Sequence, residues 1–221
     1  MKYSNVPAKI THFINQDFRL TGIIHIGAND GEEIPFYKEI GIKNLICIEP
    51  IPSKCRDILG YHPDVKVIEC ATGDTDCTAD LHLTNDQSKK GSSLLEDVED
   101  KLAFNNGGTS VETIKVDVRR MDKICGEIQD EIKNFNCIVI DVQGYELQTL
   151  IGFGSCINLF DFWSIECSRD PVYKGEHPAK EIIRYMKEHG FTQDSPIEEH
   201  NDIFFVSQHI KPRSAQIFRG E

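Results

Sequence analysis

The sequence predicts an α/β protein with a doubly wound, mostly parallel sheet of about seven strands and a small β insertion. Short apolar runs alternate with amphipathic stretches of helix length, which is the order of βαβ units. Glycine or proline separates most of these segments. The chain has 221 residues, the size of one domain, so we expect residues 1–221 to form a single unit.

The strands of this sheet are predicted from continuous apolar runs, which indicate strands buried on both faces. The first run ends at Gly27, the second at Pro50 and the third near Gly73. The expected strands are residues 21–26, 44–49, 65–71, 137–141, 160–166 and 202–206.

The helices are predicted from amphipathic stretches that follow these runs and end at glycine, a common residue at helix C-termini. The expected helices are residues 32–40, 52–59, 121–131, 146–151 and 178–189. The tail at residues 207–221 is expected to be peripheral.

Residues 75–118 depart from this order. Two segments, 79–84 and 111–118, alternate apolar and polar residues as half-exposed strands do. The polar segment between them is rich in glycine, serine and asparagine. We therefore expect an inserted hairpin, which is either a lid over a site or a surface elaboration.

Composition excludes several classes of protein. A net charge of −12 disfavours nucleic acid and anionic lipid surfaces as partners. No apolar run approaches the ~20 residues of a membrane-spanning helix. The eight cysteines form no Cys-x-x-Cys pair, and the first residues lack the apolar core of a secretory signal. These features predict a cytoplasmic protein with free thiols.

A glycine-rich turn and an acid indicate a nucleotide-type site. Residues 27–32 read Gly-Ala-Asn-Asp-Gly-Glu after the first strand, and Glu49 ends the second strand. An acid at that distance accepts hydrogen bonds from a ribose. Two of the three dinucleotide-binding glycines are absent, with Asn29 and Glu32 in their places. Acids at the turn suit an ammonium and a sulfonium better than a pyrophosphate, which favours S-adenosylmethionine over NAD.

Two further acids follow neighbouring strands. Asp141 ends a buried run and Glu166 ends the next one, where open α/β sheets bind ligands. We predict that Asp141 and Glu166 are catalytic and that one of them takes a proton from an acceptor hydroxyl. The alternative for Asp141 is a helix N-cap, whereas Glu146 is expected to support the helix start or the loop. No ligand spacing selects a metal, so none is expected.

Taken together, these motifs resemble the FkbM family of S-adenosylmethionine-dependent methyltransferases from about Thr21 to Val206. The resemblance rests on five segments, which are residues 27–31, 48–50, 91–94, 140–146 and 165–168. It implies a Rossmann-like class I methyltransferase sheet with an antiparallel last strand, and O-methylation, commonly of sugar or natural-product hydroxyls.

The resemblance also implies roles for individual residues. Gly27, Asn29 and Gly31 would approach the methionine part of the cofactor, and Glu49 would hold the ribose. Ala71 and Thr72 would flank the adenine, and Ser93, with Ser92, would close over the site. The chain departs from the class at His25, which stands where an acid often lies near the amino group.

Three alternatives stay open at this point. One is an NAD-dependent oxidoreductase or epimerase, and another is a methyltransferase acting on a non-sugar small molecule. The third is a binding module or a domain of a larger glycan-assembly protein or complex. The expected partner is a small-molecule or glycan acceptor, with no nucleic acid and no membrane insertion.

Overall fold

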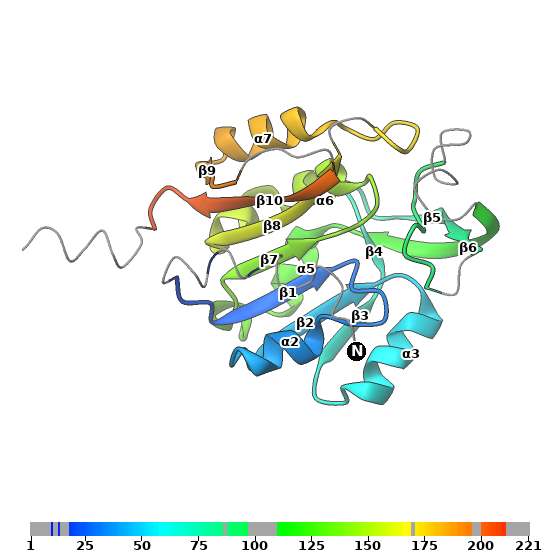
Figure 1. Ribbon diagram of the computed structural model, residues 1–221, viewed down its shortest axis with the longest axis horizontal. Coiled ribbons are helices and arrows are strands. Elements are labelled where there is room, and N and C mark those ends of the chain that lie inside the picture. Colours follow the sequence, from blue (N-terminus) through cyan, green and yellow to red (C-terminus); the bar gives the residue numbers. More distant parts are fainter. Residues whose placement is uncertain are drawn as a thin grey trace, which may run out of the picture.

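The structure is a computed structural model that describes residues 10, 13, 18–85, 88–96, 110–168, 171–195 and 200–210. Seven strands form one sheet in the order β3–β2–β1–β7–β8–β10–β9 (Figure 1). All neighbours pair in parallel except β10, which is antiparallel to both β8 and β9. The predicted doubly wound, mostly parallel sheet is confirmed. Its strands are β1 (Gly22–Ile26), β2 (Asn44–Glu49), β3 (Lys66–Glu69), β7 (Cys137–Ile140), β8 (Phe162–Ser168), β9 (Phe191–Gln193) and β10 (His200–Ser207).

The central strands are apolar on both sides because helices cover both faces of the sheet. Ile24 and Ile26 of β1 belong to one core cluster, which also contains residues of α5 (Met121–Glu127), α6 (Glu146–Phe153) and α7 (Ala179–Glu188). Ile23 belongs to the opposite cluster, with residues of α2 (Ile34–Glu39) and α3 (Pro52–Tyr61). Successive side chains of a strand point to opposite faces, so one continuous apolar run supplies both cores.

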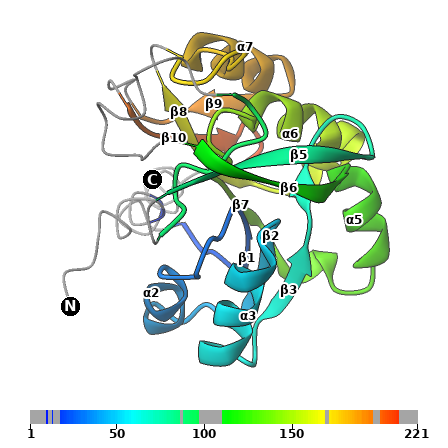
Figure 2. The same cartoon turned by 90° about the vertical axis from the view of Figure 1, so that its right-hand side faces the viewer.

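The insertion forms a second, three-stranded sheet in the order β4–β6–β5. Its two long strands are β5 (Cys77–Thr84) and β6 (Ser110–Arg119), which pair antiparallel as the alternating pattern predicts. The third strand is β4 (Ala71–Thr72), which pairs parallel with β6. In Figure 1 the small sheet lies at the end of the large sheet toward which β1 runs, and Figure 2 shows β5 and β6 crossing in front of that end.

Several predicted boundaries are wrong. The run at residues 65–71 splits, because β3 ends at Glu69 and the chain crosses to the small sheet at Ala71. The predicted helix at 121–131 ends at Glu127 and is followed by the 3₁₀ turn η1 (Ile132–Asn134). A second 3₁₀ segment, η2 (Gly154–Leu159), precedes β8. Strand β9 was not predicted, since three residues are too short for a periodic pattern.

Parallel strands place their carboxyl ends at one edge of a sheet. The loops that follow β1, β2 and β7 therefore lie together, beside the small sheet (Figures 1 and 2). Within the described residues, no helix has the length and apolar character needed to cross a bilayer.

Candidate functional site

The turn after β1 is held so tightly that its first residue has to be glycine. Gly27 has a φ of +80°, and a Cβ added to it would overlap the carbonyl group of Asp141. The N–H groups of Gly27 and Ala28 both donate to the carbonyl oxygen of Ile48, at 2.9 and 3.2 Å. The turn is thus fixed against the ends of β2 and β7 by its backbone, and it brings Gly27 next to Asp141.

Asn29 and Glu49 meet directly. The Asn29 N–H donates to Glu49 Oε2 at 2.8 Å, and the Ile51 N–H donates to Oε1 at 2.9 Å. The Glu49 side chain is buried, with only 3% of the residue exposed. An ionised carboxylate has about four acceptor positions, so each oxygen keeps capacity for one more donor. Two vicinal hydroxyls of a ribose are donors of that kind.

The protonation of Glu49 is set mainly by its burial. Burial raises the pKa of Glu49 to about 7, from an ordinary 4.5, and the charge of Asp141 acts in the same direction. The N–H groups of Ile51 and Asn29 act against this rise, as does the charge of Lys54. Glu49 therefore changes charge near neutral pH, where a ligand that donates hydrogen bonds favours the ionised form.

Gly31 and the acids around it form the entrance to α2. Gly31 has a φ of +73°, and a Cβ on it would lie 2.6 Å from Ile34 Cδ1. Its missing side chain therefore faces apolar packing. Lys54 lies 3.7 Å from Asp30 Oδ2, and Lys90 pairs with Glu32 at 2.5 Å. These two lysines offset part of the negative charge at the turn.

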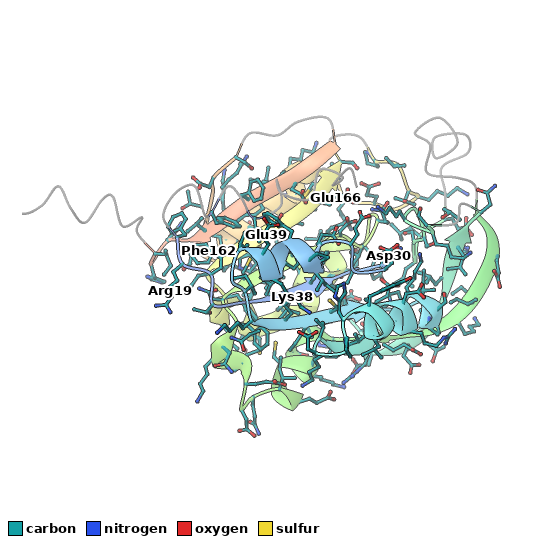
Figure 3. The ribbon with its side chains drawn as sticks, turned by 60° about the horizontal axis from the view of Figure 1, so that its bottom comes forward. Arg19, Asp30, Lys38, Glu39, Phe162 and Glu166 are labelled. Carbon is teal, nitrogen blue, oxygen red and sulfur yellow. The ribbon has the colours of Figure 1, made fainter. Side chains whose placement is uncertain are left out.

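Asp141 and Glu166 are brought together by a third residue. Ile140 of β7 is in register with Ile165 of β8, so the following residues, Asp141 and Glu166, lie side by side. Gln143 Nε2 donates to Asp141 Oδ1 at 2.7 Å and to Glu166 Oε2 at 2.6 Å. Both acids are half-buried, so a ligand can reach them. In Figure 3 Glu166 and Asp30 lie toward one end of the sheet, while Phe162 lies toward the other.

Glu146 orders the loop that carries these groups. Its Oε1 accepts hydrogen bonds from the N–H groups of Val142 (3.2 Å) and Gly144 (3.1 Å). This is the supporting role that the sequence predicts for Glu146. The residue is 3% exposed, and burial, followed by the charge of Glu166, raises the pKa of Glu146 to about 8. A protonated Glu146 adds no third negative charge next to the acid pair.

The insertion contacts both halves of the site, through Ser93 at the loop after β7 that carries Asp141 and Gln143 (the acid-pair loop) and through Ser88 at the glycine turn. The Ser93 hydroxyl donates to the backbone oxygen of Gln143 at 2.6 Å and accepts from the Leu95 N–H at 3.0 Å. The insertion reaches the glycine turn through Ser88, whose backbone oxygen accepts from Asn29 Nδ2 at 3.0 Å. Segment 88–95 therefore spans both halves of the site.

The side chains of Ala71 and Thr72 lie in packed surroundings. Ala71 belongs to the apolar cluster of the small sheet, which includes Ile51. Thr72 is 2% exposed, and its hydroxyl lies 2.8 Å from the hydroxyl of Thr149 on α6. Neither side chain is brought to the acid pair, and both pack at the junction of the two sheets.

Comparison with known proteins decides the class to which this site belongs. A family model described as the methyltransferase FkbM domain matches residues 25–192. The chain belongs to the FkbM methyltransferase family. This membership confirms the resemblance drawn from the sequence, and it favours methyl transfer over the NAD-dependent alternative.

Individual relatives of this FkbM methyltransferase chain are distant. The 2-O-methyltransferase NoeI of Sinorhizobium fredii (strain NBRC 101917 / NGR234) is 27% identical over 169 residues, which are 73% of this chain and 69% of NoeI. The methyltransferase FkbM from Methylobacillus flagellatus KT is 15% identical, with a TM-score of 0.49 over 84% of this chain and 43% of that one. The bifunctional kinase-methyltransferase WbdD is 8% identical, with a TM-score of 0.50 over 93% and 40%. This chain thus spans less than half the length of these two structures, and the likeness to WbdD supports the fold.

Packing places three further residues of this FkbM methyltransferase chain in the core. His25 is 2% exposed, and its Nδ1 lies 3.3 Å from the hydroxyl of Tyr37, so it is a core residue of β1. Phe162 and Trp163 are 2% and 0% exposed and belong to the core. Among the described residues, no group of three or more His, Cys, Asp or Glu side chains is arranged to hold a metal ion.

The sequence did not predict a functional role for Gln143, which lies within the site. Its amide nevertheless joins both acids. Two acids at adjacent strand ends repel each other unless a donor lies between them. The arrangement depends on the register of β7 and β8, so no local sequence pattern points to it.

Proposed function

We propose that the protein transfers a methyl group from S-adenosylmethionine to a hydroxyl group of an acceptor, with a sugar or glycan as the favoured acceptor. The observation that carries the proposal is the position of Glu49. It is a buried carboxylate with acceptor capacity left on both oxygens, next to a glycine turn that also contacts Asp141. Family membership and the name of NoeI support methyl transfer to oxygen.

The residues present fit this cofactor. Glu49 offers acceptors to the ribose hydroxyls, and the turn at residues 27–31 lies directly beside it, since the Asn29 N–H donates to Glu49 Oε2. Asp30 Oδ1 is buried and accepts no hydrogen bond from any described residue, so it can take a donor such as an ammonium group. The acids of the turn also suit a positive ligand. When bound, S-adenosylmethionine supplies a methyl group already activated by its sulfonium.

The chain's own residues then have two tasks. The first is to align the acceptor with the methyl carbon, because alignment is the main contribution a protein makes to such a displacement. The second is to take the proton of the acceptor hydroxyl as its oxygen forms the new bond. Asp141 and Glu166 are the candidate bases, and both are held within hydrogen-bond distance of Gln143.

Charge near the acid pair favours a neutral acceptor. A small cavity beside it is lined by Glu146, Glu166 and Glu176, together with Gln143, Tyr173 and other residues. The carboxylates of Asp141 and Glu166, beside which the acceptor is expected, repel phosphate or sulfate groups. A neutral sugar hydroxyl meets no such repulsion and finds acceptors for its hydrogen bonds.

The test separates cofactor binding from chemistry. We expect S-adenosylhomocysteine, but not NADH, to raise the melting temperature of the wild-type protein. Methyl transfer from labelled S-adenosylmethionine would then be assayed on deoxysugar-containing glycans and on non-sugar alcohols. Transfer to non-sugar alcohols alone would replace the glycan proposal, and stabilisation by NADH alone would contradict the cofactor assignment.

Variants at the acid pair test the catalytic assignment. Asp141→Asn keeps the shape of the side chain but removes its basicity, so turnover should fall about 100-fold or more, while S-adenosylhomocysteine binds within about threefold of wild type. Asp130→Asn, at an exposed position after α5, is the matched control and should change neither quantity. Wild-type turnover in Asp141→Asn would remove Asp141 from the mechanism and leave Glu166 as the base.

A further inference from the structure

The amide of Gln143 can lie in only one orientation. Its NH₂ group faces the carboxylates of Asp141 and Glu166, at 2.7 and 2.6 Å. The reverse orientation would turn the amide oxygen toward two acceptors, which is unfavourable. The amide oxygen therefore faces away from the acids. The hydrogen-bond partner of this oxygen determines how firmly the amide is held between Asp141 and Glu166.

That partner is Tyr173. Its hydroxyl lies 2.9 Å from Gln143 Oε1 and 3.1 Å from the backbone oxygen of Gly91 in the insertion. The single hydroxyl hydrogen can be donated to either oxygen. Tyr173 is 4% exposed, so neither contact competes with bulk water. The hydroxyl thus joins the acid-pair loop to segment 88–95.

Two further contacts fix the Tyr173 ring independently of its hydroxyl. Glu176 Oε2 accepts from the N–H groups of Val172 (2.6 Å) and Tyr173 (3.0 Å), which closes a turn around the residue. The ring also packs onto Gly144, where an added Cβ would lie 2.9 Å from Tyr173 Cδ2. Gly144 has a φ of +97° and directly follows Gln143, which has a φ of +54°. The ring is therefore seated against the turn that carries the amide.

From this geometry we infer that Tyr173 is a positioning residue for methyl transfer: its hydroxyl fixes the Gln143 amide and, through it, the separation and direction of the Asp141 and Glu166 carboxylates. The inference rests on the proposed function for the reaction itself. The contacts that carry it exist whatever the acceptor is. Tyr173 lies outside the five segments that resemble the family.

The kinetic test uses Tyr173→Phe in the full chain. This variant keeps the ring on Gly144 and removes only the hydroxyl. We expect kcat to fall about tenfold, the rate equivalent of one lost hydrogen bond, with the KM of the acceptor and the Kd of S-adenosylhomocysteine within about twofold. Tyr185→Phe is the matched control, because its hydroxyl bonds the Leu150 backbone on α6, and it should leave kcat unchanged.

A double variant distinguishes positioning from a general loss of structure. Gln143→Met removes the amide while keeping a similar length of side chain. Because Tyr173 acts through Gln143, adding Tyr173→Phe to Gln143→Met should lower kcat by no more than about twofold further. Additive losses in the double variant would overturn the inference, as would an unchanged kcat in Tyr173→Phe.

A readout that needs no activity keeps this inference separate from the proposed function. In nitrogen-15 spectra, the side-chain amide signals of Gln143 are assigned by their disappearance in Gln143→Met. We expect these signals to exchange slowly with water in the wild type and in Tyr185→Phe, and several times faster in Tyr173→Phe. Unchanged exchange in Tyr173→Phe would overturn the inference. Faster exchange in a protein that methylates no hydroxyl would contradict the proposed function alone.

Discussion

Replacing Glu49 by glutamine tests the proposed ribose contact most directly. The change removes the charge of the side chain and turns one of its two acceptor atoms into a donor. In the structure both acceptors face backbone N–H groups, those of Asn29 and Ile51. Whichever way the new amide lies, its NH₂ group meets one of those donors. The variant therefore loses acceptor capacity on the side where the ribose is expected.

The size of the effect follows from the charge and the pKa of Glu49. Hydrogen bonds to charged groups contribute about 1.5–3 kcal/mol each, so losing the ribose contact should weaken S-adenosylhomocysteine about 100-fold at pH 8. In the wild type the pKa of Glu49 is about 7. If the ionised form binds, its fraction rises from about one-tenth at pH 6 to about nine-tenths at pH 8. The wild-type Kd should then fall about tenfold over that interval.

The assay is calorimetric titration with S-adenosylhomocysteine at pH 6, 7 and 8. Wild type should show the tenfold change in Kd, whereas Glu49→Gln should bind weakly at every pH and show no such dependence. Glu39→Gln is the control, because Glu39 is an exposed acid at the end of α2 and lies outside the site (Figure 3). A Kd within threefold of wild type in Glu49→Gln would refute the reasoning. So would a pH dependence that survives in the variant.

Two other predictions concern stability. Burial raises the pKa of Glu146 to about 8, above its ordinary 4.5, so the folded state favours the protonated form; this stabilisation is complete below about pH 4.5 and is lost as pH rises through 8. The free energy of unfolding by urea should therefore decrease between pH 5 and pH 9, and this decrease should be smaller by a few kcal/mol in Glu146→Gln than in the wild type. An equal decrease in both proteins would contradict this. Gly27→Ala should destabilise the fold by more than about 3 kcal/mol and abolish S-adenosylhomocysteine binding, because its Cβ meets the Asp141 carbonyl. Gly41→Ala, with a φ of +90° and nothing near its Cβ, should cost only about 1 kcal/mol, and equal losses in the two variants would show that backbone strain alone is responsible.

Much of the fold could be predicted because the large sheet is buried on both faces. The apolar run at residues 44–49 coincides with β2, since a strand that faces two cores needs apolar residues throughout. The same logic failed at residues 65–71. Apolar residues continue beyond Glu69, where β3 ends, into Cys70 and Ala71, so the sequence does not show that the chain leaves one sheet and enters another. Strand β9 is held by its pairing with β10, which short-range patterns do not show.

Some residues of the candidate site could likewise be predicted from the sequence, and others could not. The glycine turn and Glu49 could be found from the sequence because a strand–turn–helix unit brings residues together over about 20 positions. Asp141 and Glu166 could be proposed from their places at strand ends. The bridge of Gln143 between them could not, since it depends on the register of β7 and β8.

The sequence by itself determined most strands and helices of the large sheet, the glycine that the first turn requires, and the acids that close the strands. Those features follow from local backbone preference and from the need to bury apolar residues. Only the tertiary structure decided that Gln143 separates two carboxylates and that Tyr173, 30 residues further on, holds its amide. A hydrogen bond forms only if the distance between donor and acceptor, here on segments far apart in the chain, is right to within a few tenths of an ångström. Such distances are set by packing, which no single segment encodes.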